Sequence, residues 1–286
     1  MSANHAAFNL IFRFVENYIS PVAGRISSQR HVMAIRDGFI SAMPFMIVGS
    51  FLLVFAYPPF SPDTTWGFAR AWLDLAKEFE GRILTPFDMT MGIMSIYICA
   101  AIAYNLGKHY EKTNQLDPFM CAMLSIMAFL LVAAPKTNGN LPVDSLGGTG
   151  IFTAILVAVY CVEMMRFLKA HNIGIRLPDQ VPPMIKNSFD LLIPVLVVVL
   201  TLYPLSLLIQ HHFDMLIPQA IMAIFKPLVS AADSLPAILL AVLVGHLLWF
   251  AGIHGAAIVS GMLQMFWLTN LGMNQQALAQ GAPLPH

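Results

Sequence analysis

Long stretches without a charged residue dominate this sequence. Six of them, each about 18–20 residues long, lack Asp, Glu, Lys and Arg and cover residues 39–57, 89–106, 118–135, 145–162, 191–210 and 234–253. A helix of that length rises about 30 Å, the thickness of the hydrocarbon core of a bilayer. A seventh uncharged stretch, residues 255–272, holds Gln264, Thr269 and Asn270. The pattern predicts a polytopic membrane protein with six full spans and a seventh segment that crosses or turns back.

The composition agrees with this class and narrows the fold. Hydrophobic residues make up 58% of the 286 residues and charged residues 10%, against about 25% charged in soluble domains. Backbone groups in lipid must be hydrogen-bonded internally, which leaves helices or a closed barrel. Barrel strands would show alternation over about ten residues, which is absent here. We therefore predict an all-α transmembrane bundle, and the net charge of zero gives no reason to expect nucleic acid as a partner.

The cysteines and the N-terminal segment carry no catalytic signature. Cys99, Cys121 and Cys161 lie inside apolar runs without a CxxC pair, so we expect them to pack in the interior and to form neither a disulfide framework nor a metal site. Residues 8–19 place apolar side chains on one helical face, as in a helix that lies on a membrane surface. We assign residues 1–36 to a cytoplasmic amphipathic segment, and we expect no cofactor and no catalytic residue.

The basic residues of the connections predict the orientation in the membrane. If the runs cross alternately, ten Lys and Arg residues fall on the N-terminal side and five on the other. Because basic residues are retained in the cytoplasm, we predict a cytoplasmic N-terminus. The first connection on the opposite side, between residues 58 and 88, is read as an acidic loop. Its acidic residues are Asp63, Asp74, Glu78, Glu80 and Asp88.

Polar chemistry enters the apolar runs most clearly in the string GHLLWFAGIHG, residues 245–255. On a helix, His246, Trp249 and His254 share one face, and Gly252 and Gly255 flank His254. Glycines let the backbone leave the helix and let a ligand approach closely. A Trp face beside hydrogen-bonding His is a common way to hold a sugar ring. These five residues are the candidate substrate site.

Other interpretations of these residues remain open. A His in a span can bond the carbonyl of a neighbouring helix, and a Trp near a helix end can anchor the protein at the membrane surface. An ion-coupled carrier would need an intramembrane Asp or Glu, and the apolar runs contain none. An intramembrane enzyme would need paired carboxylates or metal-ligand spacing, which are also absent. A non-transporting sensor or assembly partner is the remaining alternative.

Four strings together resemble one family. They are RHVMAIRDGFISAMPFMIVGS (residues 30–50), TMGIMSIYICAAIAYNLG (90–107), IRLPDQVPPMIKNSFDLLIP (175–194) and LLWFAGIHG (247–255). In this order they resemble the membrane-embedded IIC component of bacterial phosphoenolpyruvate-dependent phosphotransferase systems of the lactose/cellobiose/chitobiose group. The resemblance covers nearly the whole chain.

The resemblance implies a mechanism and a domain organisation. It implies a homodimer in the bacterial cytoplasmic membrane, with residues 37–213 as scaffold and dimerisation helices and residues 214–286 as the start of a sugar-binding domain. A β-linked disaccharide would be bound, with His254 and Trp249 in the site, and presented to the phosphocysteine of the IIB subunit, which lies downstream of IIA. The IIC chain itself would supply binding, not phosphoryl chemistry.

One departure from the family's pattern concerns the second half of the sugar site. Family members carry an Asn-Glu-Pro-Ile motif whose carboxylate contacts the sugar, and no such string occurs in these 286 residues. We therefore expect this sequence to correspond to the N-terminal two-thirds of such a permease. A fragment, a split gene product and an inactive remnant are all open at this stage.

Overall fold

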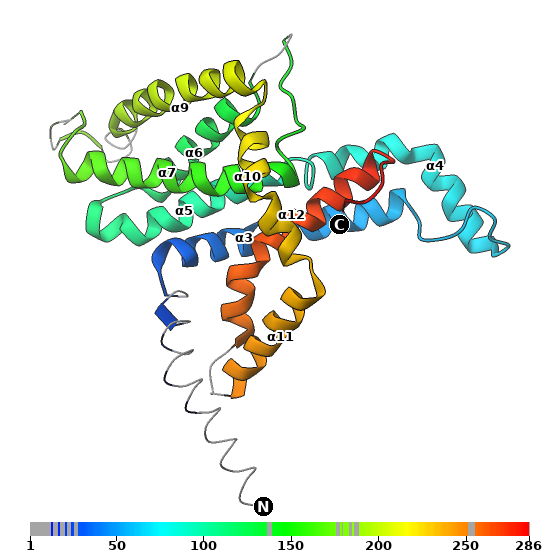
Figure 1. Cartoon of the computed structure of the whole chain (residues 1–286). Helices are drawn as coiled ribbons and strands as arrows, with labels where there is room; N and C mark the ends of the chain where they lie inside the picture. The colour runs from blue at the N-terminus through cyan, green and yellow to red at the C-terminus, as the bar shows by residue number, and fades with distance from the viewer. Residues whose placement is uncertain are drawn as a thin grey trace, which may run out of the picture.

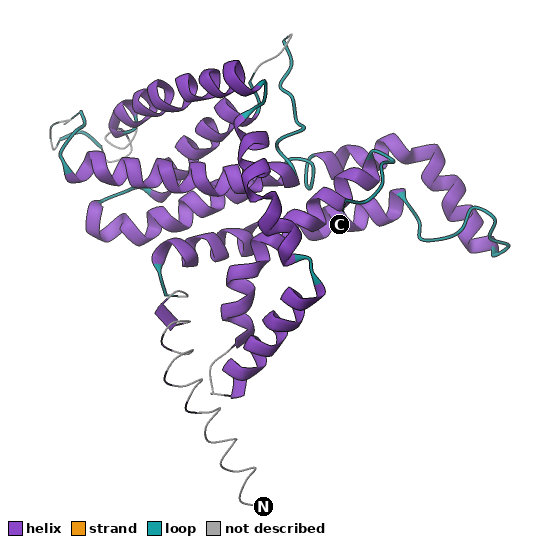
Figure 2. Cartoon of the chain, in the orientation of Figure 1, coloured by secondary structure: helices purple, strands orange, loops and turns teal. Residues whose placement is uncertain are grey.

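The computed structural model describes residues 28–135, 139–175, 189–250 and 255–285, and outside these ranges residues 13, 17, 21, 24, 25, 178, 180–182 and 185. In this part of the chain the regular structure is helical and contains no strand (Figure 2). The predicted all-α fold class is therefore confirmed. The amphipathic segment predicted at residues 8–19 lies outside the described residues except for Arg13 and Asn17.

Four helices form the core of the bundle. They are α3 (Arg30–Ala56), α5 (Met94–Asn114), α6 (Pro118–Ala133) and α7 (Ile151–Ala170), and α5 packs against each of the other three (Figure 1). The side chains of Ile98, Ile102 and Leu106, one face of α5, are completely buried. Close packing of this kind excludes lipid as well as water from the centre of the bundle.

Local sequence signals explain where two of these helices begin. The side chain of Gln29 accepts a hydrogen bond from the backbone N–H of Val32 (2.8 Å) and caps α3. Asp117 caps α6 by accepting from the N–H of Phe119 (2.8 Å), and Pro118 follows at the first helical position. An acceptor side chain followed by proline satisfies or removes the free N–H groups of a first turn.

The predicted cysteine environment is confirmed. Cys99, Cys121 and Cys161 come from α5, α6 and α7 and are all buried, with Cys99 Sγ 3.5 Å from the carbonyl oxygen of Ser125. No group of His, Cys, Asp and Glu side chains suited to a metal occurs in the described ranges. The three thiols act as small packing groups in the centre of the bundle.

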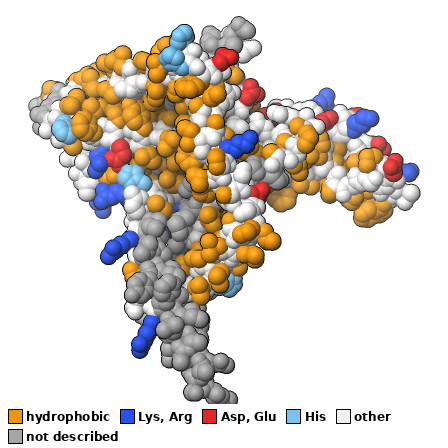
Figure 3. Space-filling view, viewed as in Figure 1, with side chains coloured by type: hydrophobic (Ala, Val, Ile, Leu, Met, Phe, Trp, Pro, Cys, Tyr) orange, Lys and Arg blue, Asp and Glu red, His pale blue; other side chains and the backbone are white. Residues whose placement is uncertain are grey.

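Helices α9 and α10 cover one side of this core, and α11 leaves it. α9 (Leu192–Phe213) exposes Leu196, Leu200 and Leu208 to about half or more of their full area, and Figure 3 shows hydrophobic side chains over this surface. α10 (Ile217–Ala232) and α11 (Leu235–Phe250) follow each other at an angle of 69°. Exposed leucines of this kind are typical of a helix that faces lipid.

The last helix turns back from α11 and returns to the bundle. α12 (Gly255–Ala279) first pairs with α11 and then passes α10 to reach α3 and the short 3₁₀ turn η2 (Gly148–Gly150). Figure 1 shows this α11–α12 pair projecting from the core. The seventh uncharged stretch is therefore one arm of a helical hairpin.

The number of spans differs from the prediction of six. Among the described residues, three helices are long and apolar enough to cross a membrane, namely α3, Gly148–Ala170 and α9. A fourth is added if the bent pair α10 and α11 is one broken span. The sixth predicted span is a helix of only 16 residues at an angle to its neighbour, and α6 is equally short. The count of six full spans is therefore not confirmed.

The predicted acidic loop between residues 58 and 88 is wrong for most of its length. Residues Gly67–Asp88 form α4, a helix of 22 residues that projects with the end of α3 as an arm (Figure 1). Its charged residues interrupt any long apolar run, so a search for spans does not find it. The helical periodicity of its apolar residues, at intervals of three and four, would have predicted this helix.

Candidate functional site

Two of the five candidate site residues, His246 and Trp249, line a groove between α11 and α12. It has a volume of about 530 Å³ and is lined by Gly245, His246, Trp249 and Trp267, with aliphatic side chains between them. Ligand pockets commonly enclose about 300–1,000 Å³ and are mostly apolar with a few polar groups. The groove is open, and its size and lining suit one small molecule with an apolar face.

His246 is held by its own helix. Its Nδ1 lies 2.7 Å from the carbonyl oxygen of Val242, four residues earlier in α11. A carbonyl oxygen only accepts, so Nδ1 carries the hydrogen and Nε2 of the neutral ring is a hydrogen-bond acceptor. The alternative interpretation is that a His in a span bonds a carbonyl of a neighbouring helix. His246 does bond a carbonyl, but one of its own helix. The same bond orients the ring, whose side chain is exposed at the groove.

Two tryptophans face this groove. Trp249 is 57% exposed and Trp267 38% exposed, and they come from α11 and α12 respectively. An indole face stacks on the apolar face of a ring, and its N–H donates a hydrogen bond. The spacing in the sequence identified Trp249 but not Trp267 as a site residue. Only the antiparallel return of α12 brings the second indole to the first.

The remaining candidate residues divide between the two helices and the connection. Gly255 is the first residue of α12, and Gly245, which was part of the same string, lines the groove. His254 and Gly252 lie outside the described residues. Their predicted role in substrate binding stays a prediction.

The hairpin is stabilised by a small apolar cluster of its own. Ala241 and Leu248 of α11 pack with Val259 of α12, and Leu248 is completely buried. A Cβ added at Gly245 would lie 3.8 Å from Val259, so the two helices approach at ordinary contact distance there. This cluster keeps α11 and α12 together below the groove.

The other end of α12 is fixed by close backbone contact with η2. A Cβ at Gly148 would lie 2.9 Å from the backbone nitrogen of Met273 and 3.0 Å from the carbonyl carbon of Gly272. Only glycine permits this approach. Nearby, Gln275 donates from Nε2 to the hydroxyl of Ser50 in α3 at 2.7 Å. These contacts place α12, and with it Trp267, relative to the core.

Further polar groups accompany this end of α12. Tyr57 donates its hydroxyl hydrogen toward Glu80 of α4 (2.9 Å) and lies 3.0 Å from the carbonyl oxygen of Ala279. Burial, with the neighbouring Glu80 carboxylate, raises the pKa of Tyr57 to about 12. Both amide atoms of Asn270 are buried without a hydrogen-bond partner among the described residues. Such an amide is costly unless a partner completes it.

The opposite end of the bundle carries an ordered charged network. Glu163 accepts hydrogen bonds from His31 (2.8 Å) and Tyr110 (2.6 Å) and forms an ion pair with Arg166 (2.7 Å). The guanidinium groups of Arg30 and Arg166 lie 5.2 and 4.9 Å from the ring centre of Tyr110. The structure thus brings to one end of the bundle two of the basic residues that the charge distribution assigned to the same side.

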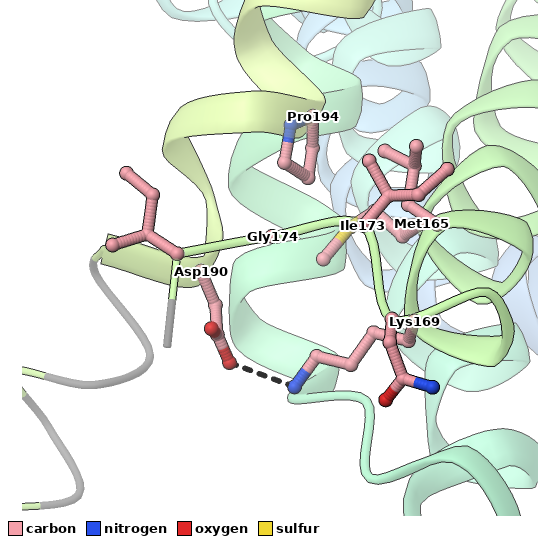
Figure 4. Close-up of a pocket in the computed structure, with 9 residues that line it drawn as sticks. Met165, Lys169, Ile173, Gly174, Asp190 and Pro194 are labelled. Carbon is pink, nitrogen blue, oxygen red and sulfur yellow. Dashed lines mark hydrogen bonds and ion pairs between the residues drawn. The ribbon is translucent and has the colours of Figure 1, made fainter. Parts of the chain in front are cut away.

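A small recess of about 120 Å³ at the end of α7 has a structural role. Figure 4 shows Lys169 of α7 bound to Asp190 at the start of α9, with Nζ 2.8 Å from Oδ2. The same Nζ donates to the carbonyl oxygen of Gln115 at 3.0 Å. Lys169 therefore joins α7 to the beginning of α9 and to the residue that ends α5.

Taken together, the helices and the groove define a class: an all-helical membrane protein with an aromatic groove beside its core. A family profile described as "Phosphotransferase system, EIIC" matches residues 36–286. The chain therefore belongs to the EIIC family, whose members are integral membrane proteins, and it is an integral membrane protein itself.

Individual relatives agree with this assignment. The chain is 33% identical to the cellobiose-specific EIIC component of Geobacillus stearothermophilus, over 96% of this chain and 62% of that protein. It is 33% identical to the lactose-specific EIICB component of Streptococcus mutans, over 91% of this chain and 45% of that protein. The crystal structure of ChbC, the IIC component of an N,N'-diacetylchitobiose-specific system, matches with a TM-score of 0.81 and 33% identity.

The lengths of these proteins differ from that of this chain. The match to ChbC covers 96% of this chain and 65% of that one, so the chain spans just under two thirds of the length of the single-component relatives. The fold and family assignments apply to the part that is shared.

Proposed function

We propose that this chain contributes to a sugar-specific permease that binds a β-linked disaccharide and presents it for phosphorylation by a IIB partner. The observation that supports this most directly is the groove that brings His246, Trp249 and Trp267 together. The specificities of the relatives support this substrate class, because cellobiose, lactose and diacetylchitobiose are disaccharides with a β linkage. A sugar ring offers an apolar face to an indole and hydroxyls to an imidazole.

The chemical role of the chain in this function is binding and orientation. Nε2 of His246 accepts a hydrogen bond from a sugar hydroxyl while Nδ1 stays bonded to Val242. His254, Gly252 and Gly255 complete the proposed site at the connection between the two helices. The phosphoryl group comes from IIB, which receives it from IIA. The buried cysteines of this chain are unsuited to carry it, because a phosphocysteine must reach its partner.

The proposed arrangement in the membrane follows the charge distribution. The N-terminus and the Glu163 network face the cytoplasm of the bacterium, where IIB binds. Residues 37–213 act as scaffold in a homodimer, and residues 214–286 belong to the sugar-binding domain. In this arrangement the loop between α7 and α9, joined by Lys169 and Asp190, is also cytoplasmic.

Equilibrium binding tests this function without requiring complete transport. The chain reconstituted in lipid nanodiscs is titrated with cellobiose, lactose, diacetylchitobiose and, as a control, the α-linked disaccharide maltose, with tryptophan emission as the readout. We expect one β-linked sugar to change the emission saturably. His254→Ala should weaken binding by about 5- to 150-fold, equivalent to the 1–3 kcal/mol of a lost polar contact, and Trp249→Ala should also weaken it, because it removes the stacking face.

A matched control separates the site from the rest of the chain. Trp72→Phe on α4 changes an aromatic residue outside the groove and should leave the affinity unaltered. Unchanged β-disaccharide affinity in both Trp249→Ala and His254→Ala, with intact folding, would contradict the proposed site. Binding of maltose with equal affinity would contradict the proposed substrate class.

A further inference from the structure

Helix α4 has an apolar stripe that the function of the groove does not explain. Phe68, Trp72, Leu75, Phe79 and Ile83 follow each other at intervals of three or four residues and so share one face of the helix. Phe68 is 62% exposed and Leu75 54% exposed. A soluble surface rarely presents a contiguous stripe of this kind without a partner.

The stripe widens into an aromatic cluster at the N-terminal end of α4. Trp72 is its centre, with ring-centre separations of 5.6 Å to Phe55, 5.7 Å to Phe60 and 5.9 Å to Phe68. Trp66 extends the cluster through Phe60 and Phe68, at 5.8 Å from each, and is itself 61% exposed. The indole N–H of Trp72 donates to the carbonyl oxygen of Phe55 at 3.1 Å.

This cluster continues an apolar surface of α3, which is a candidate membrane span. Phe51, Val54 and Phe55 in the last turns of α3 are 63%, 48% and 55% exposed. Because Phe55 contacts Trp72, the exposed surface of the span passes without interruption onto α4. Figure 3 shows hydrophobic side chains along the arm that α3 and α4 form.

Another side of α4 is polar. Arg70, Asp74, Lys77 and Glu80 line a recess of about 630 Å³ between α4 and the end of α3. Arg82 lies with its guanidinium 5.5 Å from the ring centre of Phe79, where a long side chain can cover apolar surface and keep its charge in water. Charges of both signs on one side and aromatic residues on another are typical of a helix that lies in the interface of a bilayer.

We propose that α4 is an interfacial helix whose aromatic cluster lies in the headgroup region of the bilayer beside the end of α3. Because the cluster continues the exposed surface of α3, a candidate membrane span, we take lipid rather than a second protein as the occupant. Indole rings prefer this region because one part of the ring is apolar and the N–H needs a polar partner. Through Tyr57 and Glu80, this anchor also fixes the depth at which the far end of α12 is held.

Tryptophan fluorescence in reconstituted vesicles tests the proposed location. The chain has four tryptophans, so Trp249→Phe combined with Trp267→Phe leaves Trp66 and Trp72 as the emitters. We expect lipids brominated near the headgroup to quench this emission about twofold more strongly than lipids brominated near the chain end. Aqueous acrylamide should quench it less than it quenches free tryptophan. In the reciprocal variant, Trp66→Phe with Trp72→Phe, the emission comes from Trp249 and Trp267 and so measures the quenching of the groove separately.

Thiol labelling supplies an independent readout that needs no tryptophan substitution. The native cysteines are buried, so Leu75→Cys on the stripe and Lys77→Cys on the polar side of α4 can be labelled selectively. A charged maleimide should label Leu75→Cys about tenfold more slowly than Lys77→Cys in vesicles, because the thiolate is disfavoured beside lipid.

Two results would overturn the proposal. Equal labelling rates with no quenching by either brominated lipid would place the cluster in water. Slow labelling of Leu75→Cys that becomes fast on dilution of the protein within the membrane, again without lipid quenching, would show that a second copy of the chain covers the stripe. Neither result depends on sugar binding, so the proposal and the proposed function are tested separately.

Discussion

Replacing Gly148 by alanine should destabilise the packing of α12 on the core. The new Cβ would lie 2.9 Å from the nitrogen of Met273, 3.0 Å from the carbonyl carbon of Gly272 and 3.2 Å from the carbonyl oxygen of Thr269. All three atoms belong to the backbone of one helix. No rotamer change relieves such contacts, so α12 as a whole must move away from η2.

The magnitude follows from the cost of forcing an extra methyl group into a packed interior. Such substitutions cost about 1–3 kcal/mol when the surroundings must shift. With about 2 kcal/mol, and 2–4 °C per kcal/mol for a chain of roughly this size, the midpoint of thermal unfolding should fall by roughly 4–8 °C. Trp267, which α12 carries, should also change its emission.

Thermal unfolding of the purified protein in detergent, followed by tryptophan emission, measures this effect. Gly245→Ala is the matched control, because its Cβ would meet only Val259 at 3.8 Å and, since alanine favours a helix interior over glycine, its midpoint should not fall. Gly272→Ala should give an intermediate loss, since the end of the flexible Met94 side chain can yield. The reasoning is refuted if Gly148→Ala and Gly245→Ala unfold at the same temperature.

Three further substitutions probe the rest of the structure. Ser95→Ala removes a buried hydroxyl that donates to the carbonyl oxygen of Gly147 at 2.6 Å, and should lower the unfolding free energy by about 1 kcal/mol in a denaturant titration. The side chain of Asp88 is exposed, but its partial desolvation raises its pKa above the ordinary value of 3.8, so the folded state loses a little stability as pH rises through that raised pKa. Asp88→Asn should therefore raise the unfolding midpoint at neutral pH relative to the wild type and leave it unaltered in acid, and an equal effect at both pH values would contradict this sign. Lys169→Met should lower stability by at most about 1 kcal/mol, because its pair with Asp190 is partly exposed, but should speed amide hydrogen exchange at the start of α9.

The sequence predicted the helices with long apolar runs well and the others poorly. The runs identify α3, α7 and α9 because these helices face lipid on one side and the core on the other, and both environments favour apolar side chains. Helix α4 mixes charges with an apolar stripe, so its signal is periodicity rather than length. The angle between α10 and α11 arises at Asp233 and Ser234, where two short helices meet. A count of apolar residues alone does not detect such a break.

The candidate site could be predicted within one helix but not between two. His246 and Trp249 share a face of α11 because of their spacing, and both line the groove. Trp267 lies 18 residues further along the chain and reaches the groove only because α12 turns back. Its position depends on the contact of Gly148 with Gly272, which joins residues far apart in the sequence. Contacts of this kind leave no periodic pattern.

The position of that glycine contact along α12 has a mechanical consequence. Gly272 lies 17 residues from Gly255 and 7 residues from Ala279, so a rise of about 1.5 Å per residue gives arms of about 26 and 10 Å. A rigid tilt of α12 about this contact acts as an unequal lever. A displacement of about 1 Å at the end near Tyr57 becomes about 2.5 Å, in the opposite direction, at the tip of the hairpin. Small movements at one surface of the protein would thereby displace the hairpin that carries the aromatic groove.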